Sequence, residues 1–452
     1  MGAAMNAAGL IMATALIMAT ALIGVAAAAC SGTQPRAPAA VPTAAQKLDQ
    51  AFKAVVADPT HGMSSLSVLA VRGGKVSYAA QFGMRYIDPL NGLASRAATP
   101  DTMYRIASVS KLVTTMAVMK LVEQGKLSLD EDVSVYLGFS LRNPAFPNSK
   151  ITLRMLLSHT SSLRDDGGYS WGFEVALRDV IARGGPVWAA GSAPGAYFAY
   201  SNLNWGVVGT IMEAAAGQRF DHLMRRLVLQ PLGLRGGYNV AEFSSADWSN
   251  VATLYRKRPA EGAWNPTGPW VAQFDDTSRP PPPVAHLESY VAGRNGTLFS
   301  PTGGLRISAA DLGKIMLMLL NDGRHQGAAF LQPASVGAMF SRQWTFTPDR
   351  PNGDTHGGLF AAWGLGAQHF EQRAGQRSSL VEGGGFAASG HLGEARGVLS
   401  VFALDFHNRN GMVVLIGGTA HDPASTPGHY SALSRQEKLI LTPLYRNALL
   451  TQ

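Results

Sequence analysis

Residues 104–111 read YRIASVSK and run directly into residues 112–122, LVTTMAVMKLV, with Gly125 shortly after. A helix that is apolar on nearly every face must be buried on most sides. A glycine just beyond the apolar run is typical of a helix C-terminus. The stretch therefore predicts a buried helix over 108–123. Ser108 would lie at its start and Lys111 one turn later on the same face.

This spacing suits nucleophilic chemistry. A serine hydroxyl is a weak nucleophile until a base takes its proton. A lysine amine one turn away can act as that base, because burial in a dry site lowers its pKa. Ser108 and Lys111 form the only Ser-x-x-Lys of the chain, the nucleophile motif of penicillin-recognising serine enzymes. Ser110, inside the motif, is expected to be a structural neighbour.

Composition sets the broad class. The chain has 452 residues, of which 46% are apolar and 15% charged, which is typical of a globular protein with an ample core. The net charge is +8, but the sequence has no Lys/Arg run and no basic stripe interleaved with aromatic residues. Nucleic acid is therefore not an expected partner.

The N-terminus predicts export. Residues 1–29 carry no charged side chain, and a small-residue site at 27–29 precedes Cys30, the only cysteine. This arrangement resembles a bacterial lipoprotein in which Cys30 carries the lipid. A simply cleaved secretory signal and an uncleaved anchor are the alternatives. Each places the protein outside the cytoplasm, periplasmic or membrane-anchored, with residues 30–44 as a tether.

Strand signals lie at both ends of the remaining chain. A hairpin is predicted at 66–71 and 76–82, and another at 398–406 and 412–417. Between them the pattern is helical with long loops. The expected fold class is α/β (α+β): an antiparallel sheet from the N- and C-terminal parts, flanked by helices, with an inserted mainly helical subdomain. The expected domain is 45–452, with sheet parts at about 45–107 and 305–452 and a helical part at about 108–304.

Two further motifs bring groups that serine–lysine chemistry needs. A second group must relay a proton to the leaving group, and donors must stabilise the oxyanion. Tyr200 and Asn202 follow Pro194 and Gly195 in a predicted loop before a helix. Much later, GHLG at 390–393 is expected to precede a strand.

Taken in order, Ser-x-x-Lys, Tyr-x-Asn and His-x-Gly resemble the serine β-lactamase superfamily over about residues 45–450. The similar branch holds class C β-lactamases, serine D-alanyl-D-alanine carboxypeptidases and β-lactamase-like esterases. Supporting pieces are LSHTSSL at 157–163, PLGL at 231–234 and GGLRISAADL at 303–312. The resemblance implies a β-lactamase/transpeptidase-like fold and a serine hydrolase that needs no cofactor or metal.

The resemblance also implies a role for each motif residue. Ser108 would be the acylated nucleophile, Lys111 its proton acceptor and Tyr200 the proton relay to the leaving group. The expected substrate and oxyanion residues are Asn202, His391, Gly393 and Glu394. Among them, Asn202 would orient the lysine and the substrate, and the backbone N–H groups of Ser108 and Glu394 would form the oxyanion hole.

Other patterns are weaker. Residues 168–172, GYSWG, match the Gly-x-Ser-x-Gly nucleophile elbow, but the polar segment before them is no strand, so Ser170 is not expected to react. His159 is expected to pack within its loop. Four further histidines, His356, His369, His421 and His429, lack metal-ligand spacing.

Two departures from the family pattern bear on substrate. Leu392 stands where a hydroxyl residue usually helps to hold a carboxylate, and Glu394 adds a negative charge. Arg396 or Arg377 could compensate for the lost carboxylate contact.

The favoured function is hydrolysis of a small ester or amide through an acyl-enzyme. A D-alanyl-D-alanine carboxypeptidase, acting on peptidoglycan-like peptides, or a class C β-lactamase is the alternative within the family. A penicillin-binding-like sensor that acylates without turnover, or an idle envelope protein, is the alternative outside catalysis.

Overall fold

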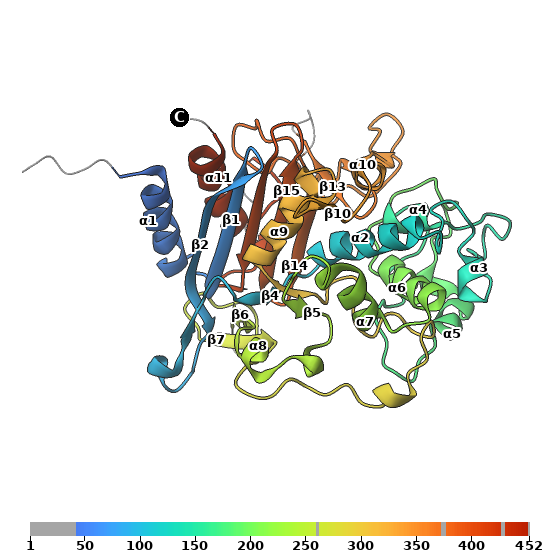
Figure 1. The fold of residues 1–452 in the computed structure, drawn as a ribbon, viewed down its shortest axis with the longest axis horizontal. Helices are drawn as coiled ribbons and strands as arrows, with labels where there is room; N and C mark the ends of the chain where they lie inside the picture. Colours follow the sequence, from blue (N-terminus) through green and yellow to red (C-terminus); the bar gives the residue numbers. More distant parts are fainter. Residues whose placement is uncertain (1–41, 259–261, 372–376, 426–429, 451–452) are drawn as a thin grey trace, which may run out of the picture. The chain divides into compact units, whose positions relative to one another are not determined.

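The computed structural model describes residues 42–258, 262–371, 377–425 and 430–450. The predicted export signal, the lipidation site at Cys30 and most of the tether lie outside these residues. The chain that is described runs from a helix and a long hairpin, through a mainly helical middle, back to strands and a last helix (Figure 1).

The helices have the following bounds: α1 Ala44–Ala57, α2 Val109–Glu123, α3 Ser134–Leu137, α4 Leu153–Leu157, α5 Leu177–Ala182, α6 Leu203–Ala216, α7 Phe220–Met224, α8 Ser245–Ser249, α9 Ala309–Leu320, α10 Pro333–Phe340 and α11 Arg435–Leu444. Five-residue π-helical turns at Arg225–Leu229 and Tyr445–Leu449 extend α7 and α11.

The main sheet has the strand order β11-β12-β13-β14-β15-β16-β1-β2-β3, with every pairing antiparallel. Its strands are β1 Ser65–Arg72, β2 Lys75–Tyr86, β3 Arg96–Ala97, β11 Trp344–Thr345, β12 Ala362–Trp363, β13 Gln368–Phe370, β14 Ala388–Ala395, β15 Val398–Asp405 and β16 Asn410–Ile416. Because β1 pairs with β16, the N- and C-terminal parts form one sheet, as predicted.

Smaller sheets lie among the helices and loops. Their strands are β4 Met103–Arg105, β5 Gly236–Gly237, β6 Leu254–Lys257, β7 Trp270–Phe274, β8 Arg306–Ser308, β9 Arg324–His325, β10 Ala328–Ala329 and β17 Gly418–Thr419.

Strand alternation explains why the main sheet is covered on both faces. In β1, Leu66 and Val68 belong to one apolar cluster, whereas Leu69 and Val71 belong to the other. Successive side chains of a strand point to opposite faces, so both faces of β1 are apolar. Helices α1 and α11 cover the first face, and α2 and α9 cover the second (Figure 1).

The sheet also holds the start of α2 in place. The Ile106 N–H donates to the Leu305 carbonyl at 3.0 Å, just before β8. The Ser400 hydroxyl, on β15, donates to the Ile106 carbonyl at 2.7 Å. The residues before Ser108 are thus held by two segments that lie some 200 and 300 residues away in the chain.

Candidate active site

Helix α2 begins where the sequence predicts, with Ser108 as its N-cap. The Ser108 side chain makes no capping hydrogen bond, so its hydroxyl is available for other partners. The preceding residue, Ala107, has φ 45°, a left-handed conformation that a residue with a Cβ rarely adopts. Such strain is held only where the surrounding structure fixes it, and it is common at active sites. Ser110 accepts the Leu305 N–H at 3.2 Å and has the expected structural position.

Lys111 is fully buried beneath this hydroxyl. Its Nζ lies 2.9 Å from Ser108 Oγ, 2.8 Å from Asn202 Oδ1 and 3.1 Å from the Thr302 carbonyl oxygen. Burial lowers the pKa of Lys111 well below its ordinary value, and the Asp165 carboxylate opposes this only in part. A neutral amine keeps a lone pair, and Ser108 Oγ is within reach to give it a proton.

Tyr200 reaches the same hydroxyl from the segment before α6. Burial raises the pKa of Tyr200, although a hydrogen bond with Ser108 lowers it. Its ring stacks on His159 at a centroid distance of 4.4 Å and on Phe360 at 5.4 Å. The phenol is therefore neutral and fixed in position, able to pass on a proton.

His159 supports this arrangement. Its Nδ1 accepts the Ser201 N–H at 3.0 Å, and the buried ring packs against Tyr200. Burial, with Lys111 nearby, lowers the pKa of His159 well below its ordinary value. His159 is thus the packing residue that the sequence analysis expects.

Asn202 is the N-cap of α6 and links Lys111 to the carboxylate of Asp165, a residue that the sequence analysis did not single out. Its Oδ1 accepts hydrogen bonds from Lys111 and from the Thr302 hydroxyl, the latter at 2.6 Å. Its Nδ2 donates to Asp165 Oδ2 at 2.9 Å. Because its amide is bonded at both ends, Asn202 has one orientation.

Asp165 is the anchor of this segment. Its carboxylate accepts four hydrogen bonds of 2.9 Å, from Ser201 Oγ, the Asn202 N–H and Nδ2, and the Leu203 N–H. An anion at the start of α6 is also favoured by the helix dipole. The sequence analysis missed Asp165, because no spacing rule relates it to residues 36–38 positions later.

His391, Gly393 and Glu394 lie within β14, and the predicted strand that GHLG precedes is β15. The sequence analysis did not identify β14 itself, because glycines are depleted in strands and are required here for close approach. A Cβ on Gly393 would lie 2.6 Å from the Ile106 carbonyl oxygen and 3.0 Å from the Ser108 backbone nitrogen. Strand β14 thus packs directly against the start of α2.

Two backbone donors are positioned by this contact. Among the described residues, the Ser108 N–H donates to no acceptor. Glu394 directly follows Gly393, the glycine that packs against the Ser108 backbone nitrogen. Glu394 and Ser108 line the same cavity. This geometry is compatible with an oxyanion site between the two N–H groups.

The cavity beside Ser108 has a volume of about 440 Å³. Its lining comprises Ser108, Tyr200, His356, Leu359, Phe360, Gln368, His391, Leu392, Gly393, Glu394, Leu399, Pro423, Ala424, Ala432, Leu433, Ser434 and Glu437. Neither Arg377 nor Arg396 is among these described lining residues, and the Arg377 guanidinium donates to the Ser431 carbonyl at 3.0 Å. Ser170, by contrast, is exposed in a loop, away from any strand-to-helix turn.

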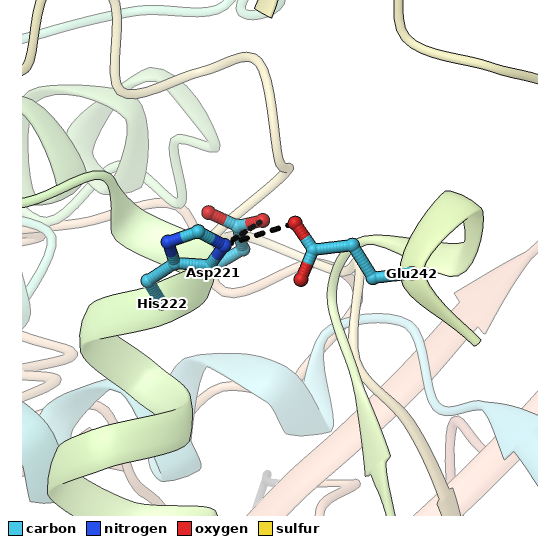
Figure 2. Close-up of side chains that lie close together, drawn as sticks. All are labelled: Asp221, His222 and Glu242. Carbon is cyan, nitrogen blue, oxygen red and sulfur yellow. Dashed lines mark hydrogen bonds and ion pairs between the residues drawn. The ribbon is translucent and has the colours of Figure 1, made fainter. Parts of the chain in front are cut away.

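A second group of ionisable residues comprises Asp221, His222 and Glu242, whose side chains converge in Figure 2. The Arg219 guanidinium donates to both carboxylates at 2.6 Å and lies 2.7 Å from His222 Nε2. The Arg219 cation bridges both acids, so an ion-pair network accounts for the cluster.

Comparison with known proteins places this geometry in context. The family model described as Beta-lactamase matches residues 48–433. Protein flp of Staphylococcus aureus (strain N315) is 31% identical over 172 residues, which cover 37% of this chain and 33% of flp. Esterase EstB of Burkholderia gladioli is 33% identical over 200 residues, which cover 40% of this chain and 50% of EstB. The chain thus matches between a third and a half of the length of these relatives.

A solved structure is similar over more of the chain. EstCE1, described as a hydrolase with promiscuous acyltransferase activity, has a TM-score of 0.61 at 22% identity. The match covers 88% of this chain and 98% of EstCE1. At that identity the similarity concerns the fold, a large antiparallel sheet with flanking helices, as the sequence predicts.

Proposed function

Because the chain belongs to the Beta-lactamase family, we propose that it is a serine hydrolase that cleaves a small ester or amide through an acyl-enzyme on Ser108. The observation that carries the proposal is the buried amine of Lys111, 2.9 Å from Ser108 Oγ and 2.8 Å from Asn202 Oδ1. A neutral amine in this position is a suitable base for the serine proton.

In the proposed acylation, Lys111 Nζ takes the Ser108 proton while Oγ attacks the substrate carbonyl carbon. The oxyanion is stabilised by the N–H groups of Ser108 and Glu394. The bond to the leaving group breaks as Tyr200 donates its proton to that group, and Lys111 re-protonates Tyr200. Water then enters, loses a proton to the same groups and attacks the acyl carbon. The bond from that carbon to Oγ breaks, Ser108 regains the proton, and the acid leaves.

The cavity lining favours substrates without a carboxylate. Leu392 cannot donate a hydrogen bond, and the exposed carboxylate of Glu394 lies on the same wall. Partial desolvation, followed by repulsion from Asp422, raises the pKa of Glu394. We therefore expect p-nitrophenyl butyrate to be a better substrate than nitrocefin or a D-alanyl peptide.

The test is covalent labelling and turnover. Ser108→Ala should abolish labelling by a fluorophosphonate and reduce hydrolysis of p-nitrophenyl butyrate by several orders of magnitude. The matched control, Ser170→Ala, should retain both. Labelling that depends on Ser170 would overturn the assignment, and labelling without turnover would point to a sensor.

We also propose, from the sequence alone, that the protein is exported and anchored through a lipid on Cys30. Among the described residues, no helix is long and apolar enough to cross a bilayer. Fractionation of cells that express the full chain or its Cys30→Ala variant tests the proposal, since loss of the cysteine should release the protein from the membrane fraction.

A further inference from the structure

The polar wall of the cavity beside Ser108 presents hydrogen-bond acceptors. Three polar residues on this wall are almost completely buried: Gln368 on β13 is 1% exposed, His391 on β14 is 2% exposed and Glu437 on α11 is 6% exposed. The hydrogen bonds of each side chain show which of its acceptor atoms has no partner among the described residues.

Gln368 has an unused oxygen. Its Nε2 donates to the Leu359 carbonyl at 2.8 Å. That bond fixes the amide orientation, because a carbonyl can only accept. The buried Oε1 has no hydrogen-bond partner among the described residues. An unpaired buried acceptor is unusual in a folded protein and calls for a partner.

His391 has an unused nitrogen. Its Nδ1 lies within hydrogen-bond distance of the Leu392 carbonyl oxygen, so Nδ1 must carry the hydrogen. Burial, with Lys111 nearby, lowers the pKa of His391 to about 3, so the ring is neutral. Nε2 therefore holds a lone pair, and it too lacks a partner among the described residues.

Glu437 adds a buried carboxyl group. The Ser434 N–H and hydroxyl donate to its Oε2 at 2.9 and 2.7 Å, and among the described residues Oε1 accepts no hydrogen bond. Glu394 supplies a second carboxyl group on the same cavity. The neighbouring Lys438 attracts the Glu437 carboxylate, but its Nζ donates to the Ser431 carbonyl, and Lys438 is not among the described residues that line the cavity.

No lysine or arginine is among the described residues that line this cavity. The remaining wall is apolar, with Leu359, Leu392 and Leu433 and the aromatic ring of Phe360. A ligand that matches this surface has a short aliphatic chain and a cationic nitrogen with N–H donors. A carboxylate would face acceptors only, and a methyl group would leave them unpaired.

We propose that this cavity is a subsite for a primary ammonium group on an aliphatic part of the substrate. The enzyme would then prefer aminoacyl esters, or amides with an amino group on the leaving amine, to their neutral isosteres. The proposal rests on the serine hydrolase function proposed above and specifies the substrate class of that site.

The experiment compares substrates in which an ammonium replaces a methyl group. On the acyl side, the p-nitrophenyl ester of β-alanine is compared with p-nitrophenyl butyrate. On the leaving-group side, N-(2-aminoethyl)butyramide is compared with N-propylbutyramide. At about pH 8, we expect kcat/KM for the ammonium member of one pair to exceed that of its isostere about tenfold or more.

Glu437→Gln should lower that ratio about tenfold, because glutamine retains the capping interaction with Ser434 but not the charge. Glu394→Gln, at an exposed position, gives the same test if the first variant fails to fold. The control Glu131→Gln, an exposed acid of the helical part, should leave the ratio unchanged.

Equal kcat/KM for the ammonium substrate and its neutral isostere in both pairs would overturn the subsite. So would a preference for the ammonium substrate that is unchanged in both Glu437→Gln and Glu394→Gln. The two proposals can fail separately. Absence of any Ser108-dependent hydrolysis would refute the hydrolase function. Hydrolysis of p-nitrophenyl butyrate without an ammonium preference would refute the subsite alone.

Discussion

A lysine amine acts as a base only if it is unprotonated near neutral pH, and the surroundings of Lys111 meet this condition. The side chain is fully buried, and that burial lowers its pKa well below the ordinary value. The nearest compensating charge is Asp165, which reaches the lysine through the Asn202 amide. At the scale of the residue, the chemistry thus depends on the pKa of Lys111, which burial lowers and the carboxylate of Asp165 raises.

Replacing Asp165 tests this balance. Asp165→Asn removes a charged acceptor of four hydrogen bonds, so turnover should fall roughly ten- to a hundredfold. Because Asp165 raises the pKa of Lys111, its loss should lower that pKa further, and the acid limb of the kcat/KM profile should move to lower pH. The neighbouring exposed Asp166→Asn is the control. An unmoved acid limb would contradict the electrostatic link.

The role of the Tyr200 hydroxyl can be tested without disturbing the packing of the ring. Tyr200→Phe removes only the hydroxyl and keeps the ring that stacks on His159 and Phe360. Acylation should slow by about a hundred- to ten-thousandfold, the usual range for a proton-transfer group, with little change in the melting temperature. Tyr197→Phe removes a hydroxyl that bonds Asp354 from the same segment and should not slow acylation. An unchanged rate in the Tyr200 variant would reduce this residue to packing.

At the scale of elements, the site is the contact between the start of α2 and the middle of β14. Neither element contains a complete oxyanion site, because Ser108 and Glu394 come from segments almost 300 residues apart. Gly393 permits the contact, since a Cβ there would meet both the Ile106 carbonyl and the Ser108 nitrogen. The Ser400 hydroxyl on β15 secures the same carbonyl from the next strand.

Gly393→Ala should therefore separate β14 from α2. We expect kcat for p-nitrophenyl butyrate to fall about a hundred- to a thousandfold, as for loss of an oxyanion donor, with a lower melting temperature. Gly337→Ala on α10 is the matched control, because its Cβ would meet no atom within 4 Å and alanine suits a helix. A Gly393 variant as active as the control would show that this close approach is dispensable.

At the scale of the whole molecule, α11 connects the C-terminus to the sheet and to the cavity. Its capping box uses Glu437, which lies in a buried position close to Glu394 and Lys438. Burial raises the pKa of Glu437 from 4.5 to about 7. A carboxyl group with a raised folded-state pKa stabilises the fold fully below pH 4.5 and loses that contribution as pH rises through 7.

Stability should therefore respond to pH through this residue. The difference in unfolding free energy between Glu437→Gln and the unmodified protein should shift in favour of the variant by about 2–3 kcal/mol between pH 4.5 and pH 8. Urea denaturation at both pH values measures it, with Glu131→Gln as the control. A difference that is the same at both pH values would show that Glu437 does not titrate in this window.

Much of the molecule follows from local sequence patterns. The apolar run after Ser108 predicts α2, and the alternation and turns at both ends of the chain predict the hairpins β1–β2 and β15–β16. Serine at the helix start with lysine one turn on also places Ser108 beside Lys111, because i and i+3 share a helix face. These features are local, so neighbouring residues suffice to determine them.

Only the tertiary structure decided the rest. Asp165 reaches the site from a loop, Gln368 from β13 and Glu437 from α11, and no spacing relates them to Ser108. The glycines of GHLG disfavour a strand locally, yet packing of β14 against α2 requires them there. Burial, which sets the pKa of Lys111 and His391, likewise arises only when distant segments pack together. The sequence by itself determined helix α2, the two hairpins and the nucleophile–base pair. Packing determined the pKa values of these groups, their orientation and the acceptor-lined cavity beside them.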